Sequence, residues 1–139
     1  MEKKELFKKN KAGMILTAVL LVAIAALLIF SKVTVTTDNQ SVTIKSALER
    51  LVIDYDEMVK IEKVDSIKAG SRVMGADLIK IYSGTFKNEE YGRYKLYIYK
   101  NISDYIVIEY EDGFVVFNQD TNELTDQLYN TILEKFANR

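Results

Sequence analysis

The 139-residue sequence contains no cysteine, no histidine and no proline, and only six glycines. Without cysteine, the chain has no disulfide bond, no thiol nucleophile and no thiolate ligand for a metal. Without histidine, it lacks the usual general base near neutral pH and the commonest metal ligand. These absences remove the residues on which many catalytic and metal sites depend. They favour a protein that is not an enzyme and that uses no cofactor.

One long uncharged run is present, from Ala12 to Ser31. A helix rises about 1.5 Å per residue, so a run of this length covers about 30 Å, the hydrocarbon thickness of a bilayer. The run predicts one transmembrane helix over residues 12–31, after a basic head (1–11) and before one polar domain (32–139). Thr17 is the only polar residue inside the run, and its hydroxyl is expected to bond the helix backbone. The apolar side chains of the expected anchor include Ala12, Met14, Leu16, Leu20, Leu27 and Phe30.

The charge is distributed unevenly along the chain. Residues 1–32 carry six lysines and two glutamates, a balance of +4, whereas the remainder carries 13 basic and 18 acidic residues, a balance of −5. Because five lysines precede the apolar run and only Lys32 flanks its other end, the positive-inside tendency predicts a cytoplasmic N-terminus and a domain outside the cell membrane. An acidic domain is poorly suited to attract nucleic acid or an anionic membrane through its overall field.

A cleaved signal peptide is an alternative interpretation of the apolar run, since Ala23-Ile24-Ala25 resembles a small-residue cleavage site. The run continues beyond that point to Phe30, however, and no small-x-small pattern follows, which favours an uncleaved signal anchor. A buried helix of a soluble protein is a third interpretation. It is disfavoured because no face of the run is polar.

After the apolar run, the hydrophobic period changes to two, which is typical of strands. The segments with this pattern are 33–37, 41–45, 50–53, 58–64, 84–87, 93–99, 105–110 and 114–118. Between residues 65 and 82 the pattern is looser, and this stretch is expected to be the largest irregular segment, with a broken strand or two short strands at 72–74 and 78–81. The last three segments are expected to form a meander with a hairpin turn at Asp112-Gly113.

The period then becomes helical, with Leu124, Leu128, Ile132 and Phe136 at four-residue spacing. This spacing predicts an amphipathic helix over about residues 120–137. Asp120 with Glu123 fits an acidic capping box at its start. The predicted fold class is therefore mainly β: a transmembrane helix, then an antiparallel β-barrel or sandwich of about seven strands, closed by one C-terminal helix.

Short strands followed by one amphipathic helix form the layout of pleckstrin-homology (PH) domains. Five segments add an acidic turn before a strand, a basic-apolar-glycine step, a Gly-x-Phe strand and a final hairpin pattern: Ile53–Ile61, Arg72–Gly75, Ser83–Phe86, Tyr91–Tyr94, and Asp112-Gly113 with Asn118. With these segments, residues 33–137 resemble the small bacterial PH-like domains that follow membrane helices. The resemblance implies a PH-like fold and no catalytic residues. It does not imply inositol phosphate binding, because the hairpin Thr34–Lys45 contains one lysine where eukaryotic PH domains that bind these ligands have a cluster.

Two groups of residues are candidates for chemistry. Asp54, Asp56 and Glu57 supply carboxylates that a hard cation could use, but the turn lacks the glycine and distal glutamate of a helix-loop-helix calcium site. A solvated acidic turn is the favoured interpretation. The serines at 41, 66, 71 and 83 have no histidine partner and no nucleophile-elbow pattern, so no serine nucleophile is predicted.

The tyrosines of residues 91–110 are candidates for binding. If Tyr94 faces the core, the alternation of a strand directs Tyr97 and Tyr99 outward beside Lys95, as an aromatic interaction surface. Ordinary cross-strand packing of these rings is the alternative.

Together these features predict a non-catalytic PH-like binding or interaction module, held at the membrane by one helix, whose ligand the sequence does not specify. The expected partners are the lipid bilayer and a protein in or near the membrane, with no nucleic acid and no cofactor. Two alternatives stay open: an accessory subunit or regulator of a neighbouring membrane protein, and, less favoured, an enzyme with an acidic site.

Overall fold

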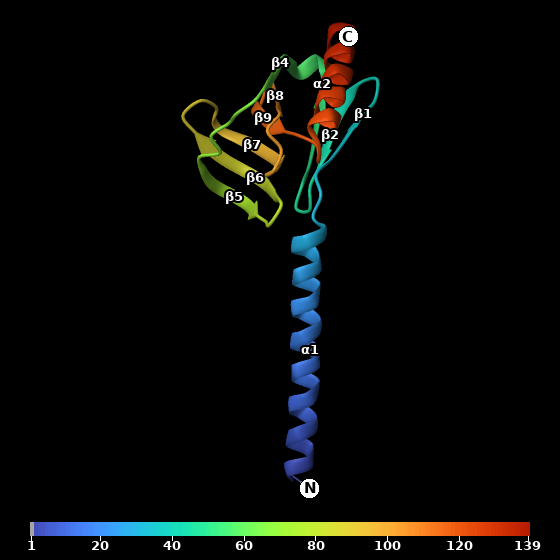
Figure 1. Cartoon of the computed structure of the whole chain (residues 1–139), viewed down its shortest axis with the longest axis vertical. Coiled ribbons are helices and arrows are strands. Elements are labelled where there is room, and N and C mark those ends of the chain that lie inside the picture. Colours follow the sequence, from blue (N-terminus) through green and yellow to red (C-terminus); the bar gives the residue numbers. More distant parts are fainter. Residues whose placement is uncertain (1) are drawn as a thin grey trace. The chain divides into compact units, whose positions relative to one another are not determined.

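The computed structural model describes residues 2–139, apart from the side chains of residues 2, 6, 7 and 9. The chain divides into two compact units, Met1–Phe30 and Ser31–Arg139. Figure 1 shows the first unit as one helix and the second as strands with a C-terminal helix. Within the predicted basic head, Met1 and the Lys9 side chain lie outside the described residues.

The first unit is helix α1, Glu2–Phe30. It contains residues 12–30 of the predicted run, with Ser31 just past its end, and by length and composition it is able to cross a membrane. Thr17 Oγ1 donates a hydrogen bond to the carbonyl oxygen of Gly13 at 2.9 Å, which confirms the expected bond to the helix backbone. The hydroxyl therefore adds no unpaired polar group to the apolar surface.

The second unit begins with a three-stranded antiparallel sheet of β1 (Thr34–Thr37), β2 (Ser41–Lys45) and β3 (Arg50–Asp54). The β1–β2 turn forms because Asp38 Oδ1 accepts the backbone N–H groups of Gln40 and Ser41, each at 2.7 Å. A short 3-10 helix, η1 (Tyr55–Glu57), leads from this sheet into the next.

The second sheet has six strands in the order β4-β8-β9-β7-β6-β5. Their bounds are β4 (Met58–Val64), β5 (Ser71–Asp77), β6 (Ile81–Asn88), β7 (Gly92–Tyr99), β8 (Tyr105–Tyr110) and β9 (Gly113–Phe117). The predicted meander is wrong in its order, because β9 lies between β7 and β8 and runs parallel to β7. The five-residue connection 100–104 is long enough to carry the chain past one strand position, about 5 Å, and the tight turn at 111–112 then returns β9 into the gap.

The mainly β architecture with one helix at each end is confirmed. Residues 2–139 form nine strands in two sheets, where about seven strands were predicted, and the sheets do not close into a barrel. One extra strand, β5, lies in the stretch that was expected to be irregular. Its pattern is weak because a bulge falls between Arg72 and Met74, which interrupts the period of two.

A pair of glycines allows the backbones of β5 and β6 to approach each other closely, and one of them, Gly75, also weakens the pattern of β5. Gly75 and Gly84 are direct partners across β5 and β6, with φ of +122° and +144°. A Cβ added at Gly84 would lie 2.3 Å from the carbonyl oxygen of Met74. Only glycine fits such a site, because it has no Cβ and tolerates positive φ.

Each face of the six-stranded sheet carries a buried apolar cluster. On one face the core includes Val42, Ile44 and Ile53 of the first sheet, Tyr97, Ile106 and Phe117 of the second, and Ile132 of the C-terminal helix. On the other face the cluster includes Phe86, Tyr91, Tyr94, Leu96, Ile98, Val107 and Val116, covered by Ile67 and Ala69 of the β4–β5 loop. The loop is fixed there by the hydroxyl of Tyr94, which donates to the carbonyl oxygen of Ala69 at 2.8 Å.

The C-terminal helix is α2, Asn122–Ala137. Its N-cap is Thr121, whose Oγ1 accepts the N–H of Leu124 at 3.1 Å, so the predicted capping by Asp120 with Glu123 is wrong. Ile132 is fully buried, whereas Leu124 is 45% exposed. The predicted apolar stripe is therefore correct at its centre and is exposed at its first turn.

Candidate functional site

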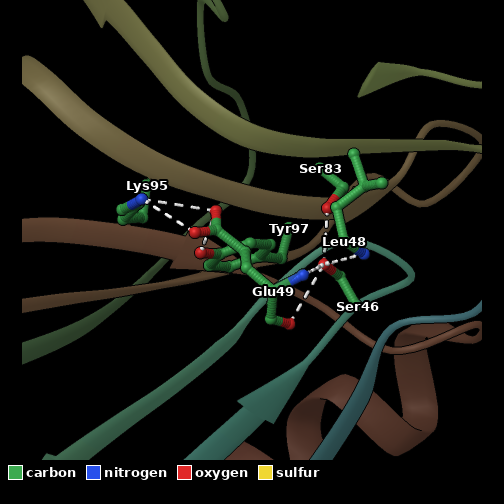
Figure 2. Close-up of polar contacts among 6 residues, drawn as sticks. All are labelled: Ser46, Leu48, Glu49, Ser83, Lys95 and Tyr97. Atoms are coloured by element: carbon green, nitrogen blue, oxygen red, sulfur yellow. Dashed lines mark hydrogen bonds and ion pairs between the residues drawn. The ribbon is translucent and has the colours of Figure 1, made fainter. Parts of the chain in front are cut away.

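Figure 2 shows a polar cluster where the β2–β3 turn meets the six-stranded sheet. Glu49, from the turn, accepts hydrogen bonds from the hydroxyl of Tyr97 at 2.6 Å and from Lys95 Nζ at 3.0 Å, both on β7. Beside it, Ser83 Oγ on β6 donates to Ser46 Oγ at 2.6 Å. The cluster therefore joins the two sheets through side chains that lie up to 48 positions apart in the sequence.

The β2–β3 turn is stabilised by its first residue, Ser46. Ser46 Oγ accepts the backbone N–H groups of Leu48 at 3.4 Å and Glu49 at 3.3 Å, and the N–H of Ser46 donates to the carbonyl oxygen of Glu49 at 2.9 Å. Serine commonly closes turns in this way. Because the backbone is fixed, the Glu49 carboxylate extends toward β7 rather than into solvent.

The electrostatics of the cluster are those of a structural contact between the two sheets. Tyr97 is only 1% exposed, and burial together with the hydrogen bond to Glu49 raises the pKa of its hydroxyl well above its ordinary value. The hydroxyl therefore stays protonated and donates. The Glu49 carboxylate accepts from both Lys95 and Tyr97, so it connects the β2–β3 turn to two residues of β7.

A double-mutant cycle tests the hydrogen bond between Tyr97 and Glu49. Tyr97→Phe and Glu49→Gln are each expected to lower the free energy of unfolding by about 1–2 kcal/mol, because the first removes the buried donor and the second removes the negative charge of the acceptor. The double variant should lose about 1 kcal/mol less than the sum. The measurement is thermal unfolding of the full chain followed by near-ultraviolet circular dichroism. All nine tyrosines follow residue 31, so this signal reports the second unit.

The matched control is the exposed ion pair between Lys60 and Glu62. Glu62→Gln should change stability by less than about 0.5 kcal/mol, since solvent weakens such pairs. Strict additivity of Tyr97→Phe and Glu49→Gln would contradict the coupling.

The exposed aromatic strip expected at Tyr97 and Tyr99 is not present. The alternation along β7 is as predicted, but the first sheet covers the face that was expected to meet solvent. Tyr97 is buried, and Tyr99 is half-buried, with a hydroxyl that accepts from the N–H of Val33 at 3.0 Å and donates to its carbonyl oxygen at 3.1 Å. These two rings belong to the packing of the core.

The acidic turn of Asp54, Asp56 and Glu57 forms η1 and its flank. Glu57 Oε2 accepts the N–H of Asp54 at 3.2 Å, and both aspartates are exposed to solvent. Among residues 2–139, no group of three or more histidines, cysteines, aspartates or glutamates is arranged to hold a metal ion.

The four serines considered as nucleophiles have other positions. The hydroxyl of Ser41 contacts Asp38 in the β1–β2 turn, and Ser83 is fully buried against Ser46. Ser66 and Ser71 line a surface groove. The Ser41 hydroxyl donates to the Asp38 carboxylate, but the backbone hydrogen bonds that Asp38 accepts from Gln40 and Ser41 lower the pKa of its carboxyl group, which makes Asp38 a weak base for activating a nucleophile.

That groove, of about 990 Å³, lies between the β4–β5 loop and the β6–β7 turn. Its lining includes Lys68 and Lys87 together with Glu89 and Glu90, so it has no single sign of charge. A smaller hollow of about 230 Å³ is lined by Tyr91 and residues of β4 and β8. Burial, with the charge of Glu90 beside it, raises the pKa of Tyr91 to about 12. The smaller hollow also contains the ion pair of Lys60 and Glu62, so both hollows carry charges of both signs.

Two sheets followed by one closing helix are the arrangement expected from the resemblance to PH domains. Residues 33–132 match the family model described as Bacterial PH domain. The chain belongs to this family. The match begins just before β1 and ends within α2, so it includes both sheets and leaves α1 outside the PH domain. No curated protein and no solved structure matches the chain.

PH domains are generally binding modules without catalytic activity. No local pattern in the sequence of this PH domain indicates the Glu49 cluster. Lys95 and Tyr97 share a face of β7, but Glu49 lies in a turn more than forty positions earlier, and nothing local connects them.

Proposed function

We propose that this protein is a membrane-anchored PH domain that binds a partner in or near the membrane and has no catalytic activity of its own. The observation that carries the proposal is the family match over the second unit of a chain whose first unit is one helix able to cross a membrane. The anchor is the uncharged run, with lipid contacts from residues that include Ala12, Met14, Leu16, Leu20, Leu27 and Phe30.

The proposed topology is a single pass of the cell membrane, with the N-terminus in the cytoplasm and the PH domain outside. The lysines before the run support this orientation, because basic residues are retained on the cytoplasmic side. The anchor is retained in the mature protein, since the apolar run continues past Ala25 to Phe30.

Crosslinking in native membranes tests the binding role. Two forms are compared: the natural chain and a variant in which residues 12–31 are replaced by an unrelated transmembrane helix. We expect the same crosslinked partner with both, because the PH domain makes the contact. Protease added to intact cells should digest the domain in both forms, and the intact mass of the untreated protein should include the anchor.

Two results would contradict this function. Loss of the partner after the helix swap would favour an accessory subunit or regulator that binds its neighbour through the helix. Loss of a cellular phenotype in Asp54→Asn with Asp56→Asn, while near-ultraviolet circular dichroism shows a folded domain, would favour an enzyme with an acidic site.

A further inference from the structure

Two turns of the PH domain lie at the end where the chain enters it, which we name the proximal end. Thr34, the first residue of β1, pairs with Lys45, so the β2–β3 turn that follows Lys45 lies at this end. Ile81, the first residue of β6, pairs with Tyr99, whose hydroxyl holds the backbone of Val33. The β5–β6 turn that precedes Ile81 therefore lies at the same end.

The tips of both turns are apolar and exposed. Leu48 in the β2–β3 turn is 58% exposed, and Ile79 in the β5–β6 turn is 65% exposed. The backbone of each tip is fixed: Ser46 closes the first turn, and Lys80 in the second accepts the N–H of Lys100 at 2.9 Å. Single apolar residues scattered over a surface need no explanation, but two apolar tips held at the same end of a domain indicate a contact surface.

Two lysines flank these tips. Lys45 and Lys80 are exposed, and neither makes an ion pair within residues 2–139. The nearby carboxylates are already neutralised, because Glu49 binds Lys95, and Asp77, at the end of β5, binds Lys100. The two turns therefore carry local positive charge in a domain whose overall balance is negative.

We propose that Lys45, Leu48, Ile79 and Lys80, which we name the proximal rim, dock on an anionic phospholipid surface. Leu48 and Ile79 enter the boundary between headgroups and acyl chains, and the two lysines contact lipid phosphates. This inference rests on the proposed anchoring by α1.

The length of the connection supports the lipid surface as the occupant. Only residues 31–33 separate α1 from β1, and four Cα–Cα steps reach at most about 14 Å. The headgroup region on each side of a bilayer is about 5–8 Å thick. The start of β1 therefore lies within about 14 Å of the end of the anchor, which is a short distance from the headgroups.

The negative balance of the whole domain does not oppose this docking. Charges farther away than about 8 Å are largely screened at physiological salt, so the lysines at the contact decide the local interaction. The anchor supplies the high effective concentration that a weak contact needs. Long-range attraction of the free domain is not required.

Single-tryptophan variants test the docking, because the chain has no tryptophan. Leu48→Trp and Ile79→Trp are made in the full chain and reconstituted into vesicles of phosphatidylcholine with 30% phosphatidylglycerol, with or without brominated lipid. The matched control is Val59→Trp, which is 63% exposed and lies beyond Asp54, at the opposite end of the domain. We expect at least twofold quenching at the two rim positions and little at residue 59. Equal quenching at all three positions, or none at the rim, would overturn the proposal.

Leu20→Trp distinguishes docking of the proximal rim from anchoring by α1. Strong quenching there with an unquenched rim would leave the anchoring in place and remove the docking. No quenching at residue 20 would overturn the anchoring and the docking with it.

Charge variants test the lysines. In the Leu48→Trp background, Lys45→Gln with Lys80→Gln should reduce the quenching by about half, whereas Lys68→Gln with Lys87→Gln, two exposed lysines of the groove at the opposite end, should not. Equal quenching in vesicles of phosphatidylcholine alone would overturn the anionic preference. Near-ultraviolet circular dichroism checks that each variant is folded.

Discussion

Gly84→Ala is expected to destabilise the PH domain by roughly 3 kcal/mol and to lower the midpoint of its thermal unfolding by roughly 12 °C. The added Cβ would lie 2.3 Å from the carbonyl oxygen of Met74 and 2.6 Å from Cα of Gly75, and φ is +144°. Relief requires β5 and β6 to separate, which breaks their backbone hydrogen bonds near the bulge. Near-ultraviolet circular dichroism of the full chain in detergent micelles measures the midpoint.

Gly92→Ala is the matched control for this prediction. Gly92 also has a positive φ, of +64°, but an added Cβ meets nothing within 4 Å. Gly92→Ala should therefore lower the free energy of unfolding only by the backbone strain at this positive φ, about 1 kcal/mol. If the two variants unfold at the same temperature, the close approach of β5 and β6 does not limit the residue at position 84.

Leu20→Arg combined with Ile24→Arg is expected to remove the protein from the membrane fraction. An arginine near the centre of a transmembrane helix costs about 2.5–3.5 kcal/mol, so the pair costs roughly 5–7 kcal/mol and shifts the insertion equilibrium by more than a thousandfold. Extraction of isolated membranes with alkaline carbonate measures the effect, because it releases proteins that are not integrated.

Leu20→Ala with Ile24→Ala serves as the control, since it shortens the same two side chains without adding charge. That variant should stay in the carbonate-resistant fraction. Retention of the arginine variant in this fraction would contradict anchoring by α1, and it would favour another mode of attachment.

The elements that the sequence predicts well are those whose signal is local. The strands at 41–45, 58–64 and 105–110 have the predicted bounds, because their period of two is unbroken. The strand β5 (Ser71–Asp77) was predicted only as a fragment at 72–74, because its bulge and Gly75 interrupt that period. The capping residue of α2 was displaced by one position, since both Asp120 and Thr121 are good N-caps and only the backbone geometry decides between them.

The candidate site was less predictable. The alternation along β7 correctly separated Tyr94 from Tyr97, but alternation only tells which side chains share a face. It does not tell whether another layer covers that face. The first sheet does so here, and the ring that was expected on the surface became part of the core.

By itself, the sequence determined the apolar run, the uneven charge, the absence of cysteine and histidine, the mainly β domain and its resemblance to PH domains. Each of these depends on composition or on neighbours within one element. The tertiary structure alone decided the insertion of β9 between β7 and β8, the pairing of Glu49 with Tyr97, and the meeting of Leu48 and Ile79 at one end. These features depend on contacts between residues far apart in the chain, and local periodicity contains no information about which distant elements pair.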